Sequence, residues 1–234
     1  MDTQTRHALK NDKFAQATAS SVSWVSGHRS SVLRWSIGAV AGLAIIAAGL
    51  IYLNQQNTAA ETSLGAALDV YSAPLAQPGA PAEADSYATA ADRAKAANQK
   101  FTAIASQYSY LPIAAKAHYF AGVTYLELGQ NATAETELKT AAGAWNHDVA
   151  NLATLALAGL YHQTARDSQA IDAYNALTAK PSETVSANSA QLALADLYAS
   201  TGKQDQARAI WAKIKDADKD GSAGSIATEK LAAK

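Results

Sequence analysis

The hydrophobic pattern of this chain repeats with a period of 36 to 37 residues from Ala115 onward. Tyr125, Tyr161 and Tyr198 mark the same position in three successive copies. Five further positions move in step with these tyrosines: Gly122, Ala158 and Ala195; Gly129, Ala165 and Gly202; Ala134, Ala170 and Ala207; Leu138, Tyr174 and Trp211; Ala141, Leu177 and Ile214. Agreement at six positions across three copies predicts a repeat protein.

Within each copy, small and large residues fall at the spacings of two packed antiparallel helices. A small residue on each helix, such as Gly122 and Ala134, lets the two backbones approach to roughly 8–10 Å. A large residue one turn later, such as Leu138, fills the space against the next copy. Because neither helix can bury its apolar stripe alone, the pattern predicts stacked helical hairpins and an all-α fold.

The small, aromatic, small, large and small residues at these offsets resemble the signature of the tetratricopeptide repeat family, whose repeat is about 34 residues long. The resemblance covers about half of the chain. It departs from the family pattern at Ala165, where glycine is usual, in lacking a tryptophan near each repeat start, and in its longer units. It implies a tetratricopeptide-repeat-like α-solenoid over residues 83–214.

An apolar stretch precedes the repeats. The 19 residues from Trp35 to Leu53 carry no charge, and a helix of that length spans about 28 Å, close to the hydrocarbon thickness of a bilayer. Trp35 and Tyr52 lie at its two ends, where amphipathic rings favour the membrane interface. The pattern predicts a single transmembrane helix over residues 35–53.

Three glycines, Gly38, Gly42 and Gly49, recur along one side of this segment. Small residues at such spacing let a second membrane helix approach closely, so they are candidates for transmembrane packing. Glycine is common in membrane helices in any case, and a purely structural role stays open.

The charges that flank the apolar stretch predict its orientation. Five basic residues precede it, Arg6, Lys10, Lys13, Arg29 and Arg34, whereas five acidic residues follow before the next basic one. The positive-inside rule then places residues 1–34 in the cytoplasm, as an amphipathic surface helix or a disordered tail, and the repeats across the membrane. A leader of 34 residues is too long for a cleaved signal peptide, so we expect an uncleaved anchor.

The remaining segments complete the expected domain organisation. For residues 54–82 we expect a first solenoid helix, with Leu64 and Tyr71 on one apolar stripe, followed by a proline-rich loop. Residues 85–108 predict the second helix of a degenerate first repeat, because Ala97, Phe101 and Ile104 lie 37 residues before their counterparts. Residues 215–234 predict an acidic turn and a capping helix.

Finer signals predict helix ends and the end of the stack. Pro112 is expected to open a helix, and Asp167 and Ser182 are expected N-caps. Ile226 and Leu231 are expected to shield the exposed end of the last repeat.

Composition excludes several classes of function. Of the 234 residues, 49% are hydrophobic but only 7% aromatic, and the formal net charge is −1. Nucleic-acid binding needs a basic footprint that this chain lacks. Because there is no cysteine, disulfides, thiol nucleophiles and thiolate metal sites are excluded.

The sequence offers few groups for chemistry. Asp216, Asp218, Asp220 and Gly221 resemble the first half of a calcium loop, but Ala227 stands where a bidentate carboxylate is needed, so a solvated acidic turn is the favoured interpretation and calcium the alternative. His118, His147 and His162 lack ligand partners at metal spacing. We therefore expect no enzyme activity, no cofactor and no small-molecule substrate.

The first helix of each hairpin is expected to line a concave groove that binds other proteins. Its exposed members would be Lys116, Tyr119, Val123, Glu127, Leu155, His162, Gln163, Leu192, Asp196 and Ser200. This mixed lining suits extended or partly folded polypeptide. The alternative is that several of these residues pack against the neighbouring helix.

The layout of basic tail, single anchor and alanine-rich repeat domain is similar to the YfgM-like ancillary subunits of the bacterial Sec translocon. The resemblance rests on this architecture and on the segment Leu9 to Leu53. It implies a single-pass protein of the bacterial inner membrane, with a cytoplasmic N-terminus and a periplasmic C-terminal domain. It also implies translocon subunits, periplasmic chaperones or unfolded clients as partners. The alternative is a structural scaffold of an envelope complex, in outer-membrane assembly or cell division.

Overall fold

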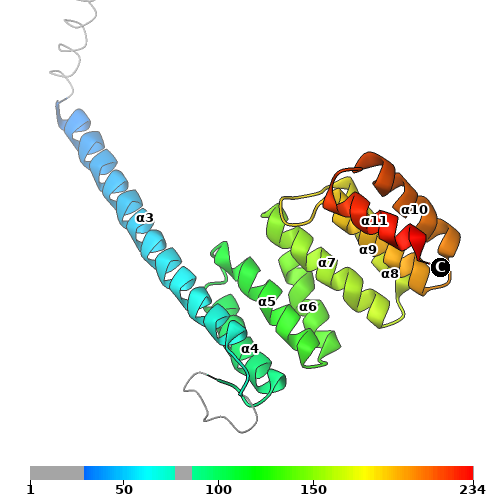
Figure 1. The fold of residues 1–234 in the computed structure, drawn as a ribbon. Coiled ribbons are helices and arrows are strands. Elements are labelled where there is room, and N and C mark those ends of the chain that lie inside the picture. Colours follow the sequence, from blue (N-terminus) through cyan, green and yellow to red (C-terminus); the bar gives the residue numbers. More distant parts are fainter. Residues whose placement is uncertain (1–28, 77–85, 234) are drawn as a thin grey trace, which may run out of the picture. The chain divides into compact units, whose positions relative to one another are not determined.

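The computed structural model describes residues 29–76 and 86–233, which are predominantly helical (Figure 1). The helices are α3 (Arg29–Ser72), α4 (Ala90–Gln107), α5 (Ile113–Glu127), α6 (Asn131–Ala142), α7 (His147–Gln163), α8 (Asp167–Ala179), α9 (Ala187–Ser200), α10 (Gln204–Ala217) and α11 (Ser222–Ala232). The described residues contain no strand, only an isolated bridge between Leu75 and Tyr87. The prediction of an all-α fold is confirmed.

Helix α3 contains the whole apolar stretch. It has 44 residues, and its most apolar window has a mean hydropathy of 2.2 with none of its residues buried. By length and composition it can cross a membrane. The segments expected at 35–53 and from 54 to Tyr71 are parts of this one helix, which continues through position 53 without a break. Residues 1–28 of the expected tail, and the loop from 77 to 82, lie outside the described residues.

The chain divides into two compact units, residues 1–55 and 56–234. In the second unit, each helix from α4 to α11 packs against the next one in sequence (Figure 1). The repeated small, large and closing positions are all buried: Gly122, Ala158 and Ala195; Ala134, Ala170 and Ala207; Leu138, Tyr174 and Trp211; Ala141, Leu177 and Ile214. The burial follows the spacing expected of helical hairpins.

A fourth pair of helices precedes these three. Ala97, Phe101 and Ile104 of α4 are buried at the positions that the repeat spacing predicts. They pack with Ala60 and Leu64 from the second half of α3. Helix α4 starts at Ala90, later than expected, because Thr89 is its N-cap and accepts a hydrogen bond from the Asp92 N–H.

The turn inside each of the three later hairpins has the same backbone geometry. Gly129 and Gly202 have positive φ angles of 71° and 78°, and Ala165 has one of 57°. In each turn the next residue donates its N–H to the carbonyl of the repeated tyrosine, as Arg166 does to Tyr161 at 2.7 Å. These bonds define a Schellman motif, which satisfies the last carbonyls of the first helix.

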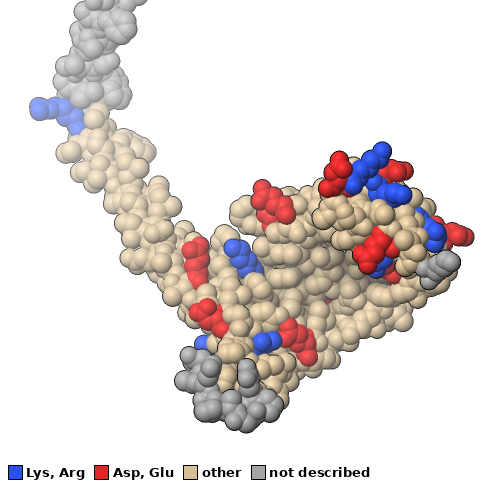
Figure 2. Space-filling view, in the orientation of Figure 1, with Lys and Arg blue, Asp and Glu red and all other residues tan. Residues whose placement is uncertain are grey.

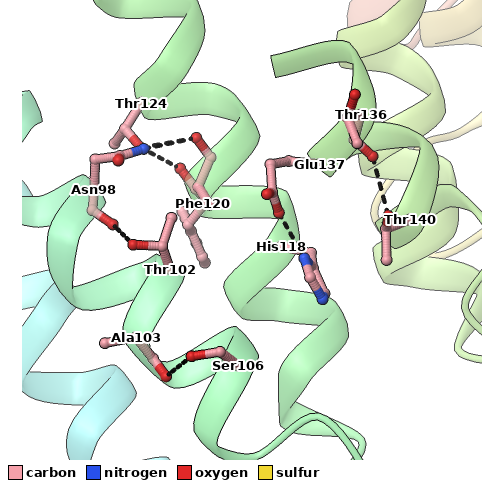
Figure 3. A network of polar contacts seen from close by, with 11 residues as sticks. Asn98, Thr102, Ala103, Ser106, His118, Phe120, Thr124, Thr136, Glu137 and Thr140 are labelled. Carbon is pink, nitrogen blue, oxygen red and sulfur yellow. Dashed lines mark hydrogen bonds and ion pairs between the residues drawn. The ribbon is translucent and has the colours of Figure 1, made fainter. Parts of the chain in front are cut away.

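A buried polar contact ties α4 to α5. Asn98 is 6% exposed, and its Nδ2 donates to Thr124 Oγ1 at 2.9 Å and to the Ala121 carbonyl at 3.1 Å. Figure 3 shows the amide of Asn98 directed at α5. Thr124 is itself fully buried and donates to the Phe120 carbonyl. The contact therefore satisfies polar groups that water cannot reach.

An ion pair joins α6 to the turn after α7. Glu135 lies 2.8 Å from Arg166 and 2.8 Å from Lys139, one turn along its own helix. The guanidinium of Arg166 also lies over the ring of Tyr161, 4.6 Å from its centroid. The hydrogen bond from Arg166, followed by that from Lys139, lowers the pKa of Glu135 to about 2.

Two predicted N-caps are wrong. Asp167 is already helical, and Arg166 precedes it at the N-cap position without a side-chain hydrogen bond. Ser182 lies in the loop before α9, whose N-cap is Ser186. Pro112 opens α5 as predicted, as the N-cap residue directly before Ile113.

The end of the repeat stack is also covered differently from the prediction. Helix α11 buries its small residues Ala223, Gly224 and Ala227 against α10, whereas Ile226 is 43% exposed. Leu231 packs at the edge of this cluster.

Candidate functional site

The ten residues predicted to line a groove all lie on α5, α7 and α9, and we call the surface they define the odd-helix face. Five of them are exposed: Lys116, Glu127, Gln163, Asp196 and Ser200. The other five are half-buried: Tyr119, Val123, Leu155, His162 and Leu192. Tyr119 and Leu155 pack against the central apolar cluster, and Leu192 packs against the C-terminal one. The prediction therefore combined exposed positions with packing positions.

Polar side chains join consecutive odd-numbered helices across this face. Tyr71 of α3 donates to Glu127 of α5, and Lys230 of α11 lies 2.8 Å from Asp196 of α9. Burial, reinforced by the bond to Glu127, raises the pKa of Tyr71 to about 12. Both carboxylates of the predicted groove are thus already paired within the chain.

The most organised group on the odd-helix face surrounds His162. Its Nδ1 lies 2.7 Å from Asp167 Oδ1, and its Nε2 lies 3.2 Å from Ser200 Oγ. These residues come from α7, α8 and α9. A carboxylate, an imidazole and a hydroxyl in this order are the groups of a serine nucleophile with its base.

The surroundings of Ser200 do not complete such a site. Acyl transfer needs N–H groups directed at the developing oxyanion, but Ser200 is the last residue of α9, where backbone carbonyls predominate. The N–H groups of Thr201, Gly202 and Lys203 are all bonded to carbonyls of α9. Ser200 Oγ also donates to the Leu197 carbonyl at 2.9 Å. We interpret the group as a polar clamp between repeats.

His118, which the sequence left without a partner, has one in the structure. Its Nδ1 lies 2.6 Å from Glu137 Oε2, so that α5 and α6 are joined near the start of the hairpin (Figure 3). His147 is the exposed first residue of α7. No periodicity signals the His118–Glu137 or His162–Asp167 contacts, because they depend on how helices pack.

The acidic turn has a structural use. Asp218 Oδ2 accepts a hydrogen bond from the Gly224 N–H at 3.2 Å, which caps the first turn of α11. Asp216 and Asp220 are exposed. Among residues 29–76 and 86–233, no group of three or more histidines and carboxylates is arranged to hold a metal ion.

The predicted membrane contact stays a prediction. Gly38, Gly42 and Gly49 lie on α3, and a Cβ atom added to any of them would meet nothing within 4 Å among the described residues. Their faces are thus open to a second helix.

Charge is unevenly distributed over the face of the second unit that Figure 2 shows. On this face, charged side chains gather over α10 and α11, whereas most of the surface over α7 is uncharged. Comparisons with protein-family models, with curated proteins and with solved structures found no match to this chain.

Proposed function

We propose that this chain is a membrane-anchored binding module whose tetratricopeptide-repeat-like solenoid holds polypeptides on its odd-helix face. One observation carries the proposal: the same repeat positions are buried, and the same turn position has a positive φ angle, in all three later hairpins. All twelve small, large and closing positions of the three later hairpins are buried, and each hairpin turns through a positive φ angle. Stacked hairpins of this kind present their first helices as one extended surface for partners.

The composition of the odd-helix face supports a polypeptide as the partner. Lys116 and Gln163 are exposed polar residues, and half-buried Val123 and Leu155 lie on the same helices. Alternating apolar and polar contacts suit the side chains and backbone of an extended segment. The absence of cysteine and the pairing of Glu127 and Asp196 within the chain favour reversible contacts over covalent chemistry.

The setting of this module is the second part of the proposal. The apolar part of α3 serves as an uncleaved single-pass anchor in a bacterial inner membrane, with the repeats in the periplasm. There the module associates with the Sec translocon and passes emerging polypeptides to periplasmic chaperones. The basic residues before Trp35 and the acidic residues after Leu53 support this orientation.

A reporter-fusion experiment tests the orientation. A periplasm-active enzyme fused after Lys234 should be active, and the same enzyme fused before Met1 should be inactive. Membrane fractionation tests the anchor. The double substitution Leu43→Arg and Ile46→Arg should release the full-length chain from membranes, because each charge costs about 2.5–3.5 kcal/mol at the helix centre. Ala59→Arg, outside the apolar stretch, should leave the chain in the membrane fraction.

Photocrosslinking in cells that express the full-length chain tests the binding function. A photoreactive residue at Lys116 or Gln163 should capture many different polypeptides during active export. The same residue at Asn175, exposed on α8, should capture few. Equal capture at all three positions would contradict a binding surface on the odd-numbered helices.

A second function, a structural scaffold of an envelope complex, is favoured by one observation. The odd-helix face is cross-linked by the Tyr71–Glu127, His162–Ser200 and Asp196–Lys230 contacts, and a pre-organised surface suits one fixed partner. The same crosslinking experiment separates the two functions. Capture of one protein in stoichiometric amount, independent of export, would establish the scaffold.

A further inference from the structure

A pocket of about 310 Å³ opens between two connections of the repeat unit. One connection joins α4 to α5 and contributes Tyr110 and Pro112; the other joins α6 to α7 and contributes Trp145. His118 lines the pocket from the second turn of α5. The pocket does not include any residue of the odd-helix face, so it is a separate site.

Two aromatic side chains at the pocket are unusually exposed. Trp145 is 78% exposed and Tyr110 is 57% exposed. Within the described part of the chain, Trp145 makes no ring contact or hydrogen bond, so its apolar surface and its indole N–H both face solvent. Exposed tryptophan and tyrosine are the residues that most often dominate binding energy at protein interfaces.

The polar chemistry of the pocket is set by the His118–Glu137 pair. A carboxylate can only accept a hydrogen bond, so the 2.6 Å contact places the hydrogen of His118 on Nδ1. In the neutral ring Nε2 is then an acceptor, and Figure 3 shows this nitrogen on the side of the ring away from Glu137. The residues that line the pocket include no Lys, Arg, Asp or Glu.

Two other polar side chains at the pocket are already engaged. Asn146 Oδ1 accepts from the N–H groups of Asp148 and Val149 as the N-cap of α7. Thr140 Oγ1 donates to the Thr136 carbonyl at 3.0 Å. Nε2 of His118 has no hydrogen bond within the described residues, so it can accept one from a ligand.

We propose that this pocket holds an aromatic side chain that carries a hydrogen-bond donor, such as tyrosine, within an extended segment of a bound polypeptide. The ring stacks on Trp145 and its hydroxyl donates to Nε2 of His118. A volume of about 310 Å³ lies at the lower end of ligand pockets, about 300–1,000 Å³, and suits one large side chain. The lining offers no Lys, Arg, Asp or Glu as a partner for a charged side chain.

The proposal rests on the proposed function, since it supplies an anchor for polypeptides that the odd-helix face also contacts. It is tested with the full-length chain in nanodiscs and three blocked pentapeptides, Gly-Ser-X-Ser-Gly, with X as tyrosine, phenylalanine or alanine. Binding is followed by the intrinsic fluorescence of Trp145, with Trp145→Phe as the reference for the other tryptophans, and by calorimetry.

We expect the tyrosine peptide to bind most tightly and the alanine peptide at least tenfold more weakly. Trp145→Ala should weaken the tyrosine peptide by tenfold or more, and Trp145→Phe by much less when measured by calorimetry. His118→Leu should remove the preference for tyrosine over phenylalanine while both still bind. Ile226→Ala, a matched loss of exposed apolar surface on α11, should change nothing.

Equal affinity for the tyrosine and alanine peptides, or an unchanged affinity in Trp145→Ala, would overturn the proposal. Melting curves of each variant exclude unfolding as the cause of a loss. The outcome is distinguishable from failure of the proposed function. If photocrosslinks at Lys116 and Gln163 persist while the peptides show no preference, the polypeptide-binding function stands and the pocket assignment falls.

Discussion

The Cβ atom that Gly122 lacks would lie 2.6 Å from Cγ of Leu138. Helices α5 and α6 thus approach so closely that even a methyl group at position 122 would clash with the leucine at position 138. The two later hairpins carry Ala158 and Ala195 at the corresponding place, with Tyr174 and Trp211 as the large residues. The largest side chain that fits at this repeat position therefore differs between the copies.

This contact predicts the effect of Gly122→Ala. Overpacking costs about 1–3 kcal/mol, and alanine in a helix returns roughly 1 kcal/mol relative to glycine, so we expect a net loss of about 1 kcal/mol in the free energy of unfolding. In a Leu138→Ala background the same change should become neutral or stabilising, because the clash is gone. Chemical denaturation in detergent of the full-length parent chain, the two single variants and the double variant measures both effects. Gly159→Ala, where a Cβ meets nothing within 4 Å, is the control and should stabilise.

A second prediction concerns Ala165, which holds a φ angle of 57° in the turn between α7 and α8. A side chain in the left-handed region costs about 1–2 kcal/mol, part of which glycine offsets with its larger loss of entropy. Ala165→Gly should therefore raise the free energy of unfolding by about 0.5–1 kcal/mol. Gly202→Ala should lower it. Ala212→Gly, exposed within α10, should destabilise by about 1 kcal/mol, and a gain there instead would contradict the explanation.

A third prediction follows from the pKa of Glu135, which Arg166 and Lys139 lower from 4.5 to about 2. A lowered carboxyl pKa contributes stability above the unfolded value, and this contribution is lost as the pH falls from about 4.5 towards 2. Glu135→Gln should lower stability by about 1 kcal/mol at neutral pH, because its partners Arg166 and Lys139 are partly exposed and water screens the pair. The difference from the parent chain should vanish near pH 2. Asp172→Asn, an exposed carboxylate on α8 without an ion pair among the described residues, should show no such convergence.

A fourth prediction concerns the Asp167–His162–Ser200 group. Because the neighbouring N–H groups are bonded within the chain, Ser200 should not react with a fluorophosphonate probe at concentrations that label serine hydrolases. Ser200→Ala and Asp167→Asn should each lower the melting temperature slightly, by a loss of about 1 kcal/mol per hydrogen bond. Covalent labelling of the parent chain that disappears in Ser200→Ala would establish a nucleophile and contradict the clamp.

The repeated positions could be predicted from sequence because each depends on local spacing. Ala134, Ala170 and Ala207 fall on the inner side of a second helix wherever the 3.6-residue period places them, and all three are fully buried. The positive φ angles at Gly129 and Gly202 also follow from a local signal, a glycine just after the end of a helix. Local signals of this kind do not depend on how distant parts of the chain meet.

The missed features depend on tertiary packing. His118 and Glu137 are 19 residues apart, and Tyr71 and Glu127 are 56 apart, so no sequence period relates them. Asp167 is not a cap because the Schellman turn at Ala165 already leads the chain into α8. The Trp145 pocket combines two connections, and no pattern within either one predicts it.

Asn98 has a consequence for how the repeats assemble in the right order. The positions that correspond to Thr124 in the next two copies are Leu160 and Leu197. If α4 docked on α7 or α9 instead of α5, its amide would face hydrocarbon where a hydroxyl acceptor is required, at a cost of about 1–3 kcal/mol. The buried amide of Asn98 therefore favours packing of α4 on α5 over packing on the similar helices α7 and α9. It disfavours misassembly in a chain of similar repeats.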